Sequence, residues 1–404
     1  MKQYSWPDDH WGWPVELTHQ HGVRCNDLVF TGGQADLDKN GAANNTGALE
    51  PQVDNVIRFV DKILQDLNAS MSNIVRWVVY FVGNTDDEAL ILSALNRATP
   101  ATCQPSVSTI CLPELCYPGM RIELEAVAWC PAPQRGLKPQ FARGANLPML
   151  PEGFSHAVRC DNLIFTSDCS ALSSTGRVRE ANDLIAQTQI MMDCLESTLA
   201  LVGAVPDDVL KINVFYEGDG TAENWSAPAL IRADRFNEPG PAATGITVDG
   251  FATPGLMTKM AVTAGVSHAA GQIEYAWPAG HWDWSEKLPY KHGNRFGNLI
   301  HLGGQVALDQ HAVVLHPDDV VRQTTIAMKN IELVLAEFGA TLDDVVKVTT
   351  FYQGSSSAEA LHENLLIRSR SYNKPGPSTS GIPVTRLVYE SMVIEIEVIA
   401  MLDA

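Results

Sequence analysis

The amino-acid sequence predicts an α+β protein made of three tandem copies of one module, and three observations lead to that prediction. A segment at the start of the chain recurs near its end at an offset of 271 positions. A weaker copy lies between them at an offset of 135. Within each copy, strand-like and helix-like runs follow one another in an order that differs from a repeated βαβ pattern.

Short motifs that keep their order carry the repeat. The run YSWPDDHWGW at residues 4–13 reappears as YAWPAGHWDW at residues 275–284, and the run GGQ at residues 32–34 reappears at residues 303–305. The second copy has Ser-Asp-Cys at residues 167–169 in place of GGQ. We therefore expect the second copy to be the degenerate one.

The expected secondary structure is the same in each copy. Apolar runs at residues 28–30, 163–165 and 299–301 are followed by turn residues and predict an early hairpin strand. The later elements are clearest in the third copy, where apolar spacing, β-branched runs and turn residues mark them. They are a helix over about 320–338 that ends at Gly339, a strand over 345–352, a second helix over about 358–372, a turn at 375–377 and two closing strands.

The repeat also gives the expected domain boundaries. We place the first module at residues 1–130, the degenerate second module at 153–268 and the third at 269–404. The stretch 131–152 contains Pro and Gly and has no periodicity, which is typical of an extended connection across a surface.

Composition and charge narrow the class of protein. The chain has 45% hydrophobic and 19% charged residues and lacks an apolar run of the ~18 residues that a membrane helix needs, so we expect a soluble protein with no membrane partner. Its 28 Lys and Arg against 47 Asp and Glu, with no basic run, argue against nucleic acid. The first residues lack a signal-peptide pattern, which favours the cytoplasm.

Metal and thiol chemistry have no sequence signature here. The eight cysteines form no Cys-x-x-Cys pair and lie mostly in apolar runs, as reduced, buried cysteines do. No His-x-His or His-Glu-x-x-His spacing occurs among the eleven histidines. We therefore expect neither a metal nor a cofactor.

The motifs together resemble the YjgF/Rid family, the reactive-intermediate deaminases formerly labelled endoribonuclease L-PSP. The resemblance covers all three copies and rests on the Gly-Gln turns at 33–34 and 304–305, the strand VVKVTTFY at 345–352 and the closing run IEIEVIA at 394–400. It implies chorismate-mutase-like modules that form an intramolecular pseudo-trimer, with small-molecule sites between modules. Further association of such a pseudo-trimer stays open.

The family's chemistry, as implied by the resemblance, is water addition to an imine or enamine with release of ammonia. The family binds a substrate carboxylate with an arginine in a Pro-Ala-Arg-like turn, and this position falls at Val107, Ala243 and Thr379 here. None of these side chains forms a bidentate pair with a carboxylate. The family's usual hydrolysis of 2-imino acids is therefore not expected.

The water-positioning glutamate of the family corresponds to Glu125 and Glu397, and to Ala261 in the second copy. The strand period of two places both glutamates of the closing run on one face, toward a neighbouring copy. Burial and a like-charged neighbour would raise at least one pKa there and favour acid or base catalysis. A solvent-exposed sheet face is the alternative. We prefer Glu397 and Glu125 over Glu395 and Glu123.

Other candidates would bind substrate. A pocket tyrosine of the family corresponds to Tyr290, with His19 and Phe154 in the other copies. The hydroxyl groups at 106–109 and at Ser378 and Thr379 could bind a neutral substrate or bond their own backbone. The glycines of the GGQ turns complete this set: Gly32, Gly33, Gly303 and Gly304.

The tryptophan-rich repeats allow two interpretations. Three tryptophans within eight residues, Trp6, Trp11 and Trp13 or Trp277, Trp282 and Trp284, are costly to expose, so they could cap the sheet or a seam between copies. Alternatively, His10 with Trp11 and His281 with Trp282 could roof a pocket for a flat substrate. His21, His156 and His292 occur in every copy, which favours a shared structural hydrogen bond over catalysis.

Three functions are consistent with the sequence. The first is a cofactor-independent enzyme that performs hydrolytic deamination, hydration, ring-opening or ring-closing on a small polar nitrogen-containing compound. The second is a ligand-binding pseudo-trimer without chemistry, and the third is a scaffold. The glutamate, the GGQ turn and the His-Trp segment persist together in copies one and three and disappear together in copy two, which favours the enzyme.

Overall fold

The computed structural model describes residues 1–266, 272–354 and 359–403. It contains three mixed β-sheets with the same strand arrangement. The first sheet has the order β1 (Gln3–Ser5), β2 (Gly22–Cys25), β3 (Leu28–Thr31), β6 (Ile122–Trp129), β4 (Ile74–Phe81) and β5 (Ser106–Cys111). The third repeats it with β14 (Glu274–Ala276), β15 (Gly293–Phe296), β16 (Leu299–Leu302), β19 (Ile394–Met401), β17 (Val345–Gln353) and β18 (Ser378–Val384).

The second sheet follows the same plan. Its order is β12 (Ala242–Val248), β11 (Val209–Glu217), β13 (Thr258–Gly265), β9 (Leu163–Thr166), β8 (Ala157–Cys160) and β7 (Gln140–Ala142), and the short β10 (Cys169–Ser170) also pairs with β13. In each sheet one parallel pair, β4 with β5, β11 with β12 or β17 with β18, joins otherwise antiparallel strands. This confirms the predicted α+β class.

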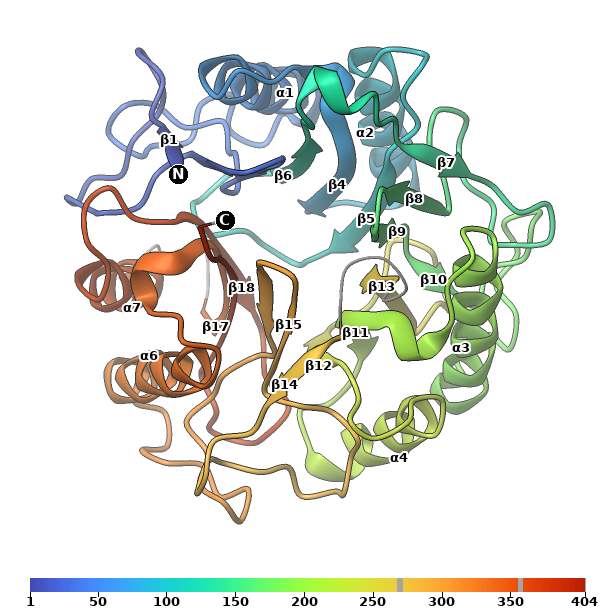
Figure 1. Cartoon of the computed structure of the whole chain (residues 1–404), viewed down its shortest axis with the longest axis vertical. Helices are drawn as coiled ribbons and strands as arrows, with labels where there is room; N and C mark the ends of the chain where they lie inside the picture. The colour runs from blue at the N-terminus through green and yellow to red at the C-terminus, as the bar shows by residue number, and fades with distance from the viewer. Residues whose placement is uncertain (267–271, 355–358, 404) are drawn as a thin grey trace.

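Two helices cover the outer face of each sheet (Figure 1). They are α1 (Leu49–Asp66) and α2 (Thr85–Ala98), α3 (Leu184–Ala200) and α4 (Ala222–Ala233), and α6 (Val320–Glu337) and α7 (Glu359–Arg370). Single 3-10 turns precede the long strands or follow the first sheet: η1 (Met71–Asn73), η2 (Pro133–Arg135), η3 (Pro206–Asp208) and η4 (Leu342–Asp344). Asp183 and Asp319 cap α3 and α6 by accepting backbone N–H bonds, as aspartate at an N-cap does.

The predicted elements of the third copy agree with these bounds. The helix expected over 320–338 is α6, and the strand expected over 345–352 is β17. Two predicted boundaries lie outside the described residues. They are the start of the second helix at residue 358 and the module boundary between residues 268 and 269. The stretch 131–152 is more than a connection, because its residues 140–142 form β7 and pair with β8 as β1 pairs with β2.

A pseudo-threefold axis relates the modules, and the sheets face it from three sides (Figure 1). Equivalent aromatic rings from the three long strands, Tyr80, Phe215 and Phe351, meet there edge to face with centroids 5.8–6.5 Å apart. Three equivalent backbone hydrogen bonds close the seams, each from an N–H of the GGQ position to a carbonyl of the next module: Gly33 to Thr379, Gly304 to Ala243 and Asp168 to Val107.

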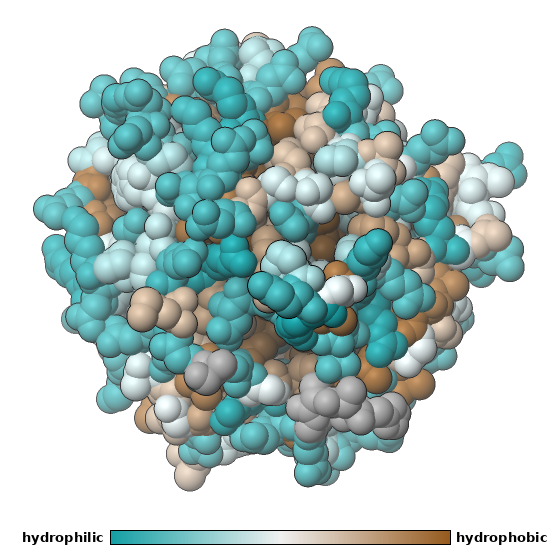
Figure 2. Space-filling model, turned by 45° about the horizontal axis from the view of Figure 1, so that its top comes forward, coloured by the Kyte–Doolittle hydropathy of each residue, from teal (hydrophilic) through white to brown (hydrophobic). Residues whose placement is uncertain are grey.

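Hydrophilic residues predominate on the face of the molecule in Figure 2, and apolar residues form separate small patches there. Within the described ranges, no helix combines the length and the apolar character that crossing a bilayer requires.

Candidate active site

The two glutamates of each closing strand reach two different places. Glu395 lines the cleft between the second and third modules, which we name cleft 2/3, whereas Glu397 lines a cavity on the pseudo-threefold axis, the axial cavity. Residues two apart share a face of the sheet but lie ~7 Å apart along the strand. The predicted catalytic Glu397 thus lies between modules, but it faces the axial cavity and not cleft 2/3.

The first module repeats this separation. Glu123 lines the cleft between the third and first modules, cleft 3/1, and Glu125 lines the axial cavity. Lys347 lies 3.0 Å from Glu125, and Lys211 lies 2.8 Å from Glu397, so both axial carboxylates pair with a lysine of the neighbouring module. The carboxyls that face the clefts are the ones the sequence interpretation ranked lower.

Cleft 2/3 combines one acid, one cation and an aromatic wall. It has an empty volume of about 570 Å³, and its walls include Glu395 from β19, Arg232 from α4 and Tyr290. The remaining lining is mainly apolar and aromatic: Trp225, Trp282, Trp284, Leu288, Val306, Val388, Tyr389 and Met392. Such a concave, apolar site with a few convergent polar groups is typical of small-molecule binding.

Arg232 is a charged residue of cleft 2/3 that the sequence interpretation missed. Its side chain is only 3% exposed, and its Nη1 makes no hydrogen bond within the described part of the chain. It lines the same cleft as Ala243, the position at which the family carries its carboxylate-binding arginine. A helix thus supplies a guanidinium to the place where the turn lacks one. The signal was present in the sequence, because Arg368 occupies the matching position of α7.

Burial sets the protonation state of the acid. Desolvation raises the pKa of Glu395 to about 8, Lys211 lowers it and Glu397 raises it further. Gly304 makes room for this carboxyl, because a Cβ at that position would lie 1.8 Å from Glu395 Oε1. Burial also raises the pKa of the Tyr290 phenol, although the neighbouring Arg232 opposes the shift. The cleft therefore holds a carboxylic acid at neutral pH.

The tryptophan-rich segments are both a cover and a cleft wall. Trp282 Nε1 and His281 Nε2 both bond Gln305 Oε1, at 3.2 and 2.9 Å, and His292 stacks on Trp284. In the first module Trp11, His10, His21 and Trp13 repeat this arrangement around Gln34. The indoles line the clefts, whereas the imidazoles of His10 and His281 are buried against the glutamines and do not, which corrects their predicted role as a pocket roof.

Cleft 3/1 has the same plan but less room. Its empty volume is about 340 Å³, and Leu361 and Leu365 of α7 fill the places of Trp225 and Ala229. Arg368 is fully buried, where it donates to Asn364 Oδ1 at 2.8 Å and to Thr379 Oγ1 at 3.1 Å. Glu123 keeps a pKa raised to about 8, mainly by burial. The cleft therefore retains the acid, whereas its arginine is already hydrogen-bonded to side chains of the same module.

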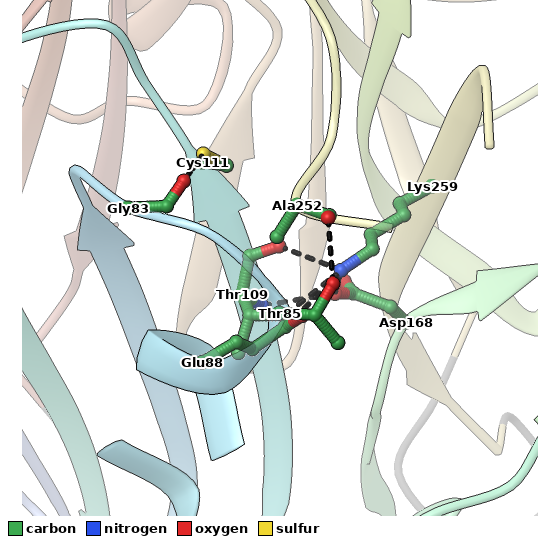
Figure 3. Close-up of polar contacts among 8 residues, drawn as sticks. All are labelled: Gly83, Thr85, Glu88, Thr109, Cys111, Asp168, Ala252 and Lys259. Atoms are coloured by element: carbon green, nitrogen blue, oxygen red, sulfur yellow. Dashed lines mark hydrogen bonds and ion pairs between the residues drawn. The ribbon is translucent and has the colours of Figure 1, made fainter. Parts of the chain in front are cut away.

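Charged side chains fill the equivalent position between the first and second modules, which we name seam 1/2. Lys259 stands where Glu123 and Glu395 stand in the other copies, and Asp168 replaces the glycine. Figure 3 shows the Lys259 ammonium between Glu88, Thr109 and Asp168, at 3.2 Å from Glu88 Oε1 and 2.8 Å from Thr109 Oγ1. In the degenerate second copy, an ion pair therefore occupies the position that corresponds to the clefts of the other two copies.

The remaining predicted residues belong to the seams. Gly32 and Gly303 let the backbones of neighbouring modules approach, since a Cβ at either would lie 2.7 Å from a carbonyl oxygen. Ser378 Oγ donates to the carbonyl of Val346 in the paired strand β17, so it bonds a neighbouring backbone and not that of its own turn. His19 is fully buried beside Tyr372, and burial lowers its pKa to about 3. Thr379 lines cleft 3/1.

The three equivalent histidines have the predicted structural role. His21 and His292 each bond the carbonyl of a tryptophan at 3.0 Å, and His156 bonds that of Pro148 at 2.8 Å. In the described ranges no group of three or more His, Cys, Asp or Glu side chains is arranged to hold a metal ion.

The fold and its clefts define a Rid-type α+β pseudo-trimer, and sequence comparison agrees. The pattern of the family described as endoribonuclease L-PSP matches residues 15–130, 146–266 and 285–402. The chain therefore belongs to this family, also known as YjgF/Rid, and contains three tandem copies of its module.

Individual relatives match one module each. A RutC family protein of Pyrococcus abyssi is 31% identical over 112 residues, which is 28% of this chain and 85% of the relative. The 2-iminobutanoate/2-iminopropanoate deaminase of Escherichia coli strain K12 is 27% identical over 113 residues, 28% of this chain and 87% of the relative. Among solved structures, a chorismatase covers 81% of this chain and 93% of its own, with a TM-score of 0.56 and 13% identity, and so shares the fold.

Proposed function

We propose that this protein is a cofactor-independent enzyme that adds water, in cleft 2/3, to the carbon–nitrogen double bond of a small planar imine bearing a carboxylate, including the imine tautomer of an enamine. The single observation that carries the proposal is that a buried guanidinium with an unbonded nitrogen and a neutral carboxylic acid face one aromatic-lined cleft. Membership of a family with imine deaminases supports the reaction type.

Arg232 would hold the substrate. A guanidinium binds a carboxylate through two parallel hydrogen bonds, and the low exposure of Arg232 strengthens such a pair. The indoles of Trp225 and Trp282 offer flat apolar surfaces to the rest of the molecule. This arrangement favours a planar, partly apolar carboxylate over the neutral polar compound that the turn sequences alone suggested.

Glu395 would move the protons. In its neutral form it donates a proton to the substrate nitrogen, which makes the adjacent carbon electrophilic. The resulting carboxylate then accepts a proton from the water that adds to that carbon. The tetrahedral carbinolamine collapses to a carbonyl compound and ammonia, and the carboxyl is again protonated. The overall reaction consumes one water and releases one ammonia.

The test is ammonia and carbonyl formation from a panel of 2-imino acids with aliphatic and aromatic side chains. We expect Glu395→Gln to reduce kcat by at least about 100-fold, in the range of lost general acid catalysis, and Arg232→Met to raise KM. Glu123→Gln is the matched control, because Glu123 occupies the same position in cleft 3/1. Full activity of Glu395→Gln, with the loss in Glu123→Gln instead, would move the reaction to cleft 3/1.

A second reaction is favoured by the same neutral acid. General acid catalysis also cleaves enol ethers, and one solved structure that shares the fold over 81% of this chain is a chorismatase. Chorismate should therefore be included in the panel. Turnover of chorismate without turnover of any imino acid would select this alternative.

A further inference from the structure

Three cations stand at equivalent positions around the pseudo-threefold axis. They are Arg76 on β4, Lys211 on β11 and Lys347 on β17, and each lies opposite the first matched residue of the parallel neighbouring strand. All three side chains are at least nine-tenths buried. A buried cation is costly unless an anion compensates it, so each position calls for a negative partner.

Two of the three cations have such a partner from the next module. Lys211 of the second module lies 2.8 Å from Glu397 of the third, and Lys347 of the third lies 3.0 Å from Glu125 of the first. The same cyclic order brings Arg76 of the first module toward the second. Its Nη1 lies 3.5 Å from Thr263 Oγ1, which confirms the direction.

The third carboxylate is missing from the sequence. Glu125 and Glu397 lie opposite Val78 and Thr349, and the corresponding residue opposite Asn213 is Ala261. Ala261 and Arg76 line the same axial cavity, whose empty volume is about 650 Å³. The methyl group of Ala261 leaves vacant the space that a glutamate side chain fills in the other two modules.

Arg76 makes no ion pair within the described ranges, and the carboxylates of Asp168, Glu125 and Glu397 attract it only from beyond 4.0 Å. Its Nε lacks a hydrogen-bond partner, and no described carboxylate oxygen lies within 4.0 Å of its guanidinium nitrogens. Asp168 also lines the cavity, but one of its oxygens accepts the N–H of Thr109 at 2.9 Å and lies 3.9 Å from Lys259. The guanidinium therefore remains uncompensated at close range.

We propose that the axial cavity binds a small monovalent carboxylate beside Ala261, where it pairs with Arg76 and completes the ring of three ion pairs. The planar fork of a guanidinium matches a carboxylate in two parallel hydrogen bonds, whereas the two lysines of the ring pair with their glutamates as point charges. This site is separate from cleft 2/3 and its ligand would stabilise the assembly of modules rather than react.

The test uses thermal unfolding of the full chain in sodium formate at constant ionic strength. Because a ligand that binds only the folded state stabilises it, the wild type should show a saturable rise in Tm of about 2 °C or more. In Ala261→Glu the covalent carboxylate replaces the ligand, so Tm without formate should already be raised and formate should add nothing. Ala261→Gln fills the same space without charge, so it should show neither a raised Tm without formate nor a rise in Tm when formate is added.

Formate bound to Arg232 in cleft 2/3 could mimic this result, so every titration is repeated in the Arg232→Met background, where the effect must persist. Crystals of the wild type grown in formate should show a planar anion against Arg76 that is absent from Ala261→Glu. An equal response to formate in all three proteins would overturn the proposal, as would an adventitious ion only, seen in the crystal without any saturable rise in Tm. If Ala261→Glu does not fold, the contrast between the wild type and Ala261→Gln decides the question.

Discussion

The carboxyl of Glu395 lies in space that only a glycine at position 304 leaves open, since a Cβ there would lie 1.8 Å from Glu395 Oε1. We expect Gly304→Ala to displace this carboxyl and to reduce kcat by at least about tenfold while the protein stays folded. Steady-state kinetics and circular dichroism check this. Gly245→Ala is the control, because its Cβ would make an ordinary 3.6 Å contact with Val214 in the same cleft. Equal activities of the two variants would contradict the role of Gly304.

The activity should fall at alkaline pH. Because Glu395 must be protonated to act as an acid and its pKa is raised to about 8, kcat/KM should decrease as the pH rises through about 8. Glu123→Gln should retain this alkaline limb, although Glu123 has a similar pKa. A profile that is flat from pH 6 to 10, for a substrate that does not itself titrate, would exclude Glu395 as the acid.

Stability should depend on pH through the same group. The folded-state pKa of Glu395 lies above the ordinary value of 4.5, so the folded state binds more protons than the unfolded state between about pH 4.5 and 8. The free energy of unfolding of the wild type therefore falls in this window as the pH rises. Glu395→Gln lacks this contribution, and urea unfolding at pH 5 and 9 should show its relative stability increasing with pH. An unchanged difference between the two proteins would argue against the raised pKa.

Glu397 should matter for stability and not for chemistry. Burial alone would raise its pKa, but Lys211 and hydrogen bonds from Thr244 and Asn213 lower it below the ordinary value, so it is a carboxylate at neutral pH. Glu397→Ala leaves Lys211 without its ion pair and should lower the free energy of unfolding by about 3 kcal/mol. Denaturant titration measures this, and kcat at a temperature where the variant is folded should be close to that of the wild type. A large loss of kcat in the folded variant would restore Glu397 as a catalytic candidate.

The ion pairs of Lys259 in seam 1/2 should stabilise the contact between the first and second modules. Lys259→Met removes the cation shared by Glu88 and Asp168 and should destabilise the chain by about 3 kcal/mol. Adding Glu88→Gln should recover part of that loss, because one of the two stranded carboxylates is then neutral. A double-mutant cycle in urea checks the coupling. Independent, additive effects of the two substitutions would show that the pair does not act as a unit.

The repeat made the fold predictable, since one module could be interpreted three times. The Ser-Asp-Cys run at 167–169 and Ala261 also pointed to the degenerate second copy, and Tyr290 lies in the better-equipped cleft as expected. The choice between Glu395 and Glu397 could not be made in this way. A strand period of two places both on one face, and only the packing of neighbouring modules decides which one meets the cleft.

Arg232 and Lys259 were missed for a different reason. The guanidinium reaches the cleft from a helix, and its position there depends on how α4 packs on its sheet, which local pattern does not specify. The repeat nevertheless held a signal for both residues, because Arg368 matches Arg232 and Lys259 stands where the other two copies have a glutamate. A lysine at a position where the other copies have a glutamate indicates that a new ion pair has replaced the acid of this site.

The three copies belong to one polypeptide chain, so each of them can change its sequence without the other two. In a trimer of identical subunits a single codon change alters three sites at once, so a substitution that closes one cleft closes all of them. Here Lys259, Ala261 and Arg76 each occur in one copy only, while the counterparts of Glu395 and Gly304 persist elsewhere in the same chain. Fusion thus allows the three positions to differ: cleft 2/3 keeps an acid and an unbonded guanidinium nitrogen, cleft 3/1 is smaller, and seam 1/2 contains an ion pair.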